Sequence, residues 1–190
     1  LSLPPYAAGP QAVGWWAVWI TMLGDSTAFA SLVFGVFFYW TSNTAFPPPG
    51  AEHASGYLVA LATAAFAASW ALTRGARSLN RARRVGLARG ALALAPVLTL
   101  AGMGGFVLSV MDLDPTAHVY PAMMWALMVW VVAHGLLATI MQLYCLAGSL
   151  FGKLTPRYDA DLWNVTLFWH FMGLTALVTG AMMGLVPRLM

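Results

Sequence analysis

The chain has 190 residues, of which 61% are hydrophobic and only 8% are charged, and its net charge is +3. Soluble domains carry about 25% charged residues, so this composition excludes a soluble domain and predicts a membrane protein. The single cysteine, Cys145, excludes an internal disulfide framework and a cysteine-based zinc site.

Five apolar stretches follow one another along the chain, at approximately 14–40, 56–73, 90–111, 120–148 and 163–186. A helix needs about 20 apolar residues to cross the hydrocarbon core of a bilayer. Prolines and aspartates interrupt the chain between the stretches, as at 47–50 and 112–115. The sequence therefore predicts one all-α integral membrane domain with five transmembrane helices.

Basic residues gather in two of the connections. Six arginines lie between the second and third stretches, and Lys153 and Arg157 lie between the fourth and fifth. The positive-inside rule places both connections in the cytoplasm, with the N-terminus inside and the C-terminus outside. The arginines either only set this topology or also contact anionic lipid headgroups. The candidates for headgroup contact are Arg74, Arg77, Arg81, Arg83 and Arg84.

Asp25 lies near the middle of the first predicted helix. A carboxyl group inside a membrane is costly and faces other helices or a cavity rather than lipid. Three interpretations stay open. Asp25 makes a hydrogen bond between helices and nothing more, it contacts a partner or handles protons, or it is the coupling carboxylate of a small transporter.

His134 and His170 lie within the fourth and fifth predicted helices. Two intramembrane imidazoles on different helices are compatible with haem ligation, as in a b-type membrane cytochrome. The alternative is that each makes a buried hydrogen bond between helices. The sequence contains no phosphate loop, metal-ligand cluster or nucleic-acid signature, and neither a metal site nor a nucleic-acid partner is expected.

Four segments together resemble subunit III of the haem-copper oxygen reductases, in the short five-span form of bacterial oxidases. The first runs from Gly14 to Gly24-Asp25, where the family has an intramembrane acid. The second is the run 68–71 of sequence Ala-Ser-Trp-Ala, the third is His134-Gly135, and the fourth, the most specific, is the run 168–171 of sequence Phe-Trp-His-Phe. The chain departs from the family at Leu137, where a second histidine is usual. The subunit III-like protein that accompanies nitric oxide reductases is a related possibility.

The resemblance implies an accessory subunit of a cytochrome c or quinol oxidase in a bacterial plasma membrane. Such a subunit holds no haem or copper; both belong to the catalytic subunit on which it packs. It supports proton uptake and lasting turnover there, and it binds phospholipid in a cleft between the first two helices and the last three. Asp25 is then expected to face this cleft or the catalytic subunit. Packing and hydrogen-bonding roles are expected for His134, Trp169, His170 and Phe171.

Overall fold

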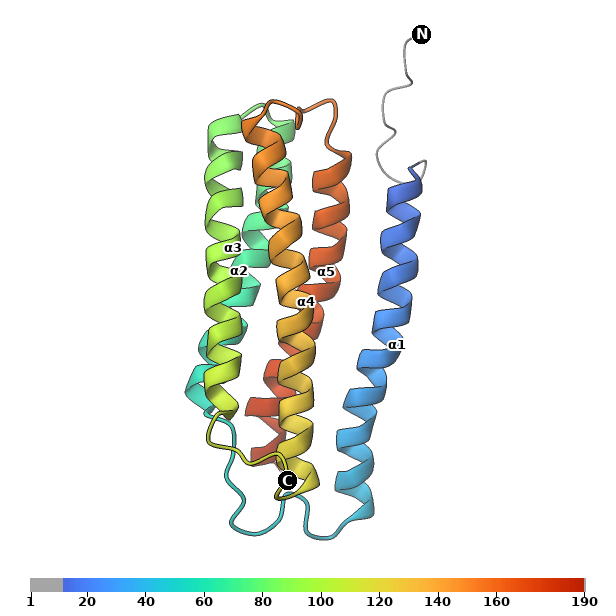
Figure 1. Cartoon of the computed structure of the whole chain (residues 1–190), viewed down its shortest axis with the longest axis vertical. Helices are drawn as coiled ribbons and strands as arrows, with labels where there is room; N and C mark the ends of the chain where they lie inside the picture. The colour runs from blue at the N-terminus through green and yellow to red at the C-terminus, as the bar shows by residue number, and fades with distance from the viewer. Residues whose placement is uncertain (1–11, 190) are drawn as a thin grey trace.

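The computed structural model describes residues 12–189, and among these it forms helices and no strand. All five long helices are long and apolar enough to cross a membrane, which confirms the predicted all-α membrane class. A short 3₁₀ turn, η1, follows the last of them (Figure 1). The helices are α1 (Val13–Ser42), α2 (Gly56–Arg81), α3 (Val85–Val110), α4 (Val119–Leu150) and α5 (Ala160–Gly184), and η1 is Val186–Arg188.

The main departure from the predicted boundaries lies between α2 and α3. The second helix continues to Arg81 rather than residue 73, and the third begins at Val85 rather than residue 90. Arginine has a high helix propensity, so its charge ends the apolar span without ending the helix. The connection is a three-residue turn in which Arg83 adopts a positive φ of 59°.

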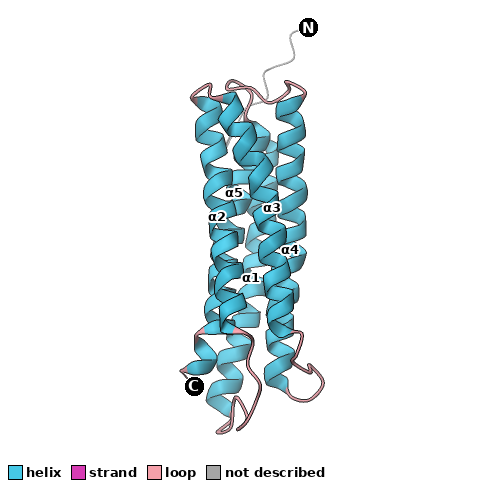
Figure 2. Cartoon of the chain, turned by 90° about the vertical axis from the view of Figure 1, so that its left-hand side faces the viewer, coloured by secondary structure: helices cyan, strands magenta, loops and turns pink. Residues whose placement is uncertain are grey.

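Four of the helices form a bundle, and α1 lies at its edge (Figures 1 and 2). The α2 helix packs along α3 and α5, whereas α1 packs against α4 and α5. The α2 helix thus packs with the last three helices rather than with α1, and the expected cleft between the first two helices and the last three stays a prediction. Small residues explain why α2 joins the bundle, because Gly102 and Gly105 of α3 allow Ala62 and Phe66 of α2 to approach closely.

The α1 helix contacts the bundle through a narrow seam. Its three buried residues, Met22, Phe29 and Val36, recur every seven positions. Asp25 and Leu32 fall between them at alternating steps of three and four, and both are partly buried. This is the spacing of a coiled-coil seam, so Asp25 occupies a position that faces the neighbouring helices.

The two basic connections lie at the same end of the bundle, where the turn between α2 and α3 meets the connection between α4 and α5 (Figure 1). Asn80 Nδ2 links them by donating to the carbonyl of Thr155 at 3.2 Å. Two helices, α3 and α4, lie between these connections in the sequence, so both connections emerge on the same side of a membrane. The positive-inside prediction requires this. Which side of the membrane they face stays a prediction.

Candidate functional site

Asp25 and His134 meet at the contact between α1 and α4. Asp25 Oδ2 lies 3.5 Å from His134 Nε2, and the exposed fractions of the two side chains are 29% and 16%. The imidazole is stacked on Trp130, one helical turn earlier, with ring centroids 4.1 Å apart. The Trp130 ring in turn contacts Phe29 of α1. The seam of α1 thus places its one acidic residue against a histidine held by an aromatic neighbour.

The hydrogen bond of His134 Nδ1 shows which ring nitrogen carries a hydrogen and leaves Nε2 to face Asp25. His134 Nδ1 lies 2.8 Å from the Trp130 carbonyl, and because a carbonyl only accepts, Nδ1 carries a hydrogen. If one further proton is placed between Nε2 and Asp25, the pair is neutral overall. It is then either a carboxylic acid beside a neutral imidazole or a carboxylate beside an imidazolium. Neutrality makes the pair tolerable at membrane depth, where an isolated charge is costly.

The run 168–171 in α5 places its side chains against two other helices, α2 and α4. Trp169 is fully buried and its ring contacts Phe66 of α2. His170 donates from Nδ1 to the Thr166 carbonyl at 2.6 Å, and its ring contacts Trp70 of α2. Phe171 faces the other way, with its ring centroid 6.1 Å from that of His134.

His134 and His170 therefore have different neighbours. The Nε2 atom of His134 is directed at Asp25 of α1, whereas the His170 ring lies edge-on against Trp70 of α2. Bis-histidine haem ligation needs two imidazoles that face one another across the iron. The structure does not present the two rings as a facing pair.

A buried polar cluster joins α2, α3 and α4 beneath the arginine-rich turn. Gln142 Nε2 donates to Ser69 Oγ at 3.0 Å and to Thr73 Oγ1 at 2.8 Å, and Gln142 Oε1 accepts from Thr99 Oγ1 at 3.2 Å. The Ser69 hydroxyl donates to the Ala95 carbonyl at 2.8 Å, and that of Thr73 donates to the Ser69 carbonyl. Each of these polar hydrogens has an acceptor, so the hydrogen bonds of the cluster are complete and hold the three helices together.

Two of the predicted headgroup ligands form an ion-pair cluster with Asp159, the residue before α5. Arg77 Nε and Arg81 Nε lie 3.3 and 2.8 Å from Asp159 Oδ2. Both guanidinium groups also lie over the ring of Trp163, at 4.0 and 5.5 Å from its centroid. Asp159 is almost fully buried, so the cluster attaches the start of α5 to the end of α2. The Arg81 side chain is still 52% exposed, and contact of these arginines with lipid headgroups stays a prediction.

The other three predicted headgroup ligands are exposed, as Arg81 is, and none of them forms an ion pair among the described residues. Arg83 and Arg84 lie in the turn between α2 and α3, and Arg74 lies more than two helical turns earlier, on an exposed face of α2. Arg74 lines a shallow cavity of about 380 Å³ together with Trp70 and Ser78. These side chains are available to lipid, to solvent or to a partner.

Sequence reasoning identified Asp25 and His134 separately but missed their pairing, the polar cluster of Gln142 and the Asp159 ion pairs. Two signals were present in the sequence. The seven-residue repeat of Met22, Phe29 and Val36 places Asp25 on the packed seam, and Trp130 lies four residues before His134. Comparison with protein-family models and with curated proteins gave no match.

Proposed function

We propose that this chain is an accessory subunit III of a terminal haem-copper oxidase, which packs on the catalytic subunit and supports its proton uptake and turnover stability. The proposal rests on one observation, which is that residues from separate family-like segments lie in contact with one another. Asp25, His134 and Phe171 come from three of the segments that resemble the family, and they meet at one contact between α1, α4 and α5. An intramembrane acid paired with a histidine suits a role beside a proton-translocating partner.

The position of α1 also supports a partner in the membrane. In α1 the only buried residues are Met22, Phe29 and Val36, whereas most of α5 is buried within the chain. Small and hydroxyl side chains lie on its outer face, including Ser26, Ala30 and Ser31. Such residues allow another helix to approach closely. The catalytic subunit is the partner proposed for this face.

Purification of the chain with its native partners in mild detergent tests the proposal. We expect a complex that consumes oxygen, contains a large many-span subunit and shows the visible spectrum of a-, b- or o-type haem. We expect the separated chain to be colourless, because the redox centres belong to the partner. Mass spectrometry of the co-purified chains identifies the large subunit.

Two outcomes would overturn the proposal. A Soret band from the separated chain would make His134 and His170 candidate ligands and the chain a membrane cytochrome. A complex that reduces nitric oxide rather than oxygen would assign the chain to the nitric oxide reductases.

A further inference from the structure

Two histidines at the end of the bundle opposite the arginine-rich turn contact the same tyrosine. His53 lies in the connection 43–55, between α1 and α2, and His118 lies in the connection 111–118, between α3 and α4. His53 Nδ1 is 2.8 Å from the Tyr120 hydroxyl oxygen, and His118 Nδ1 is 3.1 Å from the Tyr120 backbone nitrogen. Tyr120 itself is fully buried in the first turn of α4.

Both contacts use the imidazole as an acceptor. A backbone N–H only donates, so His118 Nδ1 carries a lone pair and the ring is neutral, with its hydrogen on Nε2. The Tyr120 hydroxyl has no other hydrogen-bond partner in the described part of the chain. Because a buried hydroxyl hydrogen needs an acceptor, this hydroxyl donates to His53 Nδ1. The geometry therefore fits a neutral imidazole at both positions.

Phe46 extends this contact to the end of α1. Its side chain is buried, and its ring centroid lies 5.7 Å from that of Tyr120 and 6.4 Å from that of His118. It also lies 6.1 Å from the ring centroid of Tyr39, in the last turn of α1. The contacts of Tyr120 thus hold the connection 43–55 against α4 and, through Phe46, hold the end of α1 there as well.

Protonation of the two histidines breaks these hydrogen bonds. An imidazolium accepts none, so His118 would leave the Tyr120 N–H, and with it the first turn of α4, without a side-chain cap. It would also add a positive charge at the positive end of the helix dipole. At His53 the buried hydroxyl hydrogen of Tyr120 would lose its acceptor. The closed connection therefore favours neutral imidazoles, and by linkage acid favours the open one.

The two histidines are exposed to water, and imidazole is the side chain that gains a proton between about pH 8 and 5. Hydrogen bonds from the Thr116 hydroxyl and backbone N–H lower the pKa of Asp114, so that carboxylate keeps its charge in this range. The titratable or charged residues of the surrounding elements are Tyr39, Glu52, Tyr57, Asp112, Asp114 and Arg188. In the described part of the chain none of them bonds to either imidazole.

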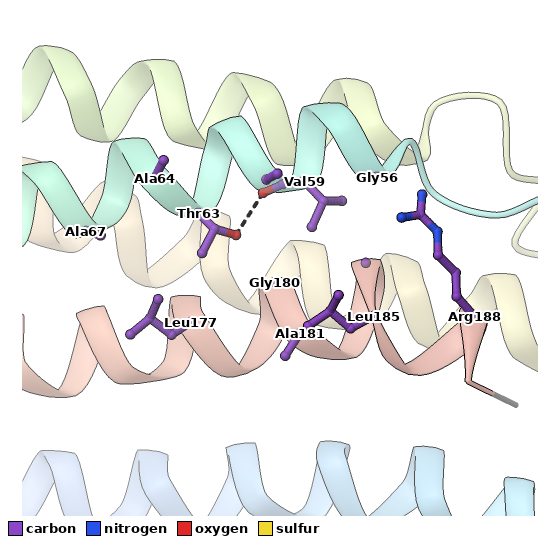
Figure 3. A pocket seen from close by; sticks show the side chains of 12 residues that line it. Gly56, Val59, Thr63, Ala64, Ala67, Leu177, Gly180, Ala181, Leu185 and Arg188 are labelled. Carbon is purple, nitrogen blue, oxygen red and sulfur yellow. Dashed lines mark hydrogen bonds between the residues drawn. The ribbon is translucent and has the colours of Figure 1, made fainter.

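Arg188 of η1 is the one cation at this end of the bundle within residues 12–189. Its guanidinium group reaches Gly56 at the start of α2, at one end of a groove of about 520 Å³ that runs between α2 and α5 beside Gly180 (Figure 3). Arginine keeps its proton in proteins, so the charge of Arg188 does not change over the range in which the histidines titrate.

We propose that His53, His118 and Tyr120 form a pH-sensitive latch. When both histidines are neutral, the latch holds the connection 43–55 and the end of α1 on α4. When the water at this end of the bundle becomes acidic, both are released, and α1 is then held only by its narrow seam of Met22, Phe29 and Val36. The latch does not depend on the oxidase proposal, because it needs only a change of pH on this side of the membrane.

Electron paramagnetic resonance of the full chain in lipid nanodiscs tests the latch. A nitroxide attached to Ala45→Cys, an exposed position beside Phe46, reports the mobility of the connection. A nitroxide attached to Lys153→Cys reports the other end of the bundle, and the native Cys145 is buried. From about pH 8 to about pH 5 we expect the ratio of mobile to immobile label at position 45 to rise about fivefold for each histidine, the usual effect of losing one helix cap. The label at position 153 should not respond.

Substitutions that keep the acceptor but do not titrate isolate the two histidines. His118→Asn retains a good helix cap, and His53→Gln retains a carbonyl oxygen for the Tyr120 hydroxyl. We expect each single variant to keep one fivefold step and the double variant to stay immobile at both pH values. Glu52→Gln is the matched control, since it removes an exposed titratable group beside His53, and it should keep the full response.

Four results would overturn the proposal. They are equal mobility at both pH values in the otherwise unaltered chain, a connection that is already mobile at the higher pH, a full response in the double variant, and loss of the response in Glu52→Gln. A parallel change at position 153 would also overturn it, because acid would then loosen the whole bundle rather than this connection.

Discussion

At the scale of residues, the intramembrane acid Asp25 of α1 lies beside His134 of α4, and this contact links the two helices. Each group is acceptable inside a membrane because the other is present, and removal of one leaves an unpaired polar group at a helix contact. Replacement of both by apolar side chains removes the cost as well as the attraction. The pair is therefore suited to a double-mutant cycle.

We expect Asp25→Leu and His134→Leu each to lower the free energy of unfolding in detergent. We expect the Asp25→Leu/His134→Leu variant to be more stable than the sum of the single effects predicts. The coupling energy should be about 0.6 to 1.7 kcal/mol, the range found for polar contacts between membrane helices. Equilibrium unfolding in mixed detergent measures it. Additive effects would show that the two side chains do not interact, and Asp25→Asn is the conservative control.

At the scale of elements, glycines determine how closely the helices approach. A methyl group at Gly102 of α3 would lie 2.7 Å from the ring of Phe66 and 3.1 Å from the Ala62 carbonyl oxygen. Phe66 is fully buried, so its ring can shift only by disturbing other packed side chains. Gly104, two residues along the same helix, is exposed and has no such neighbour within 4 Å.

This difference predicts opposite effects for one substitution at two neighbouring positions. Gly102→Ala should destabilise the chain by about 1–3 kcal/mol, because overpacking displaces the Phe66 ring. Gly104→Ala should be neutral or stabilising by up to about 1 kcal/mol, because alanine has the higher helix propensity. Thermal unfolding in detergent compares them directly. Equal effects would mean that contact between α2 and α3 is not limited by this glycine.

At the scale of the whole molecule, both basic connections lie at one end of the bundle, and the groove with Arg188 lies at the other. The positive-inside rule orients this arrangement with the basic end in the cytoplasm. A labelling experiment decides the orientation without reference to function.

We expect Glu52→Cys to react with a membrane-impermeant maleimide on intact cells, and Lys153→Cys to react only after the membrane is opened. Both positions are exposed and lie at opposite ends of the bundle. The native Cys145 is buried within α4, so the unaltered chain serves as the unlabelled control. The reverse pattern of labelling would invert the predicted orientation.

The sequence by itself determined the membrane class and the number of helices, because hydropathy over about 20 residues reports what a bilayer accepts. It also singled out Asp25 and His134, since polar groups are conspicuous in apolar stretches. The ends of α2 and α3 were less predictable, because arginines continue a helix beyond its apolar span.

Only the tertiary structure decided how the helices are arranged. Four features depend on how each helix is rotated and how closely its neighbours approach. They are the place of α1 at the edge of the bundle, the contact of Asp25 with His134, the cluster around Gln142 and the groove beside Gly180. Within an apolar stretch every face is hydrophobic, so periodicity is a weak guide to which face is packed. Contacts among small residues and buried polar groups make that choice, and they form only when the helices meet.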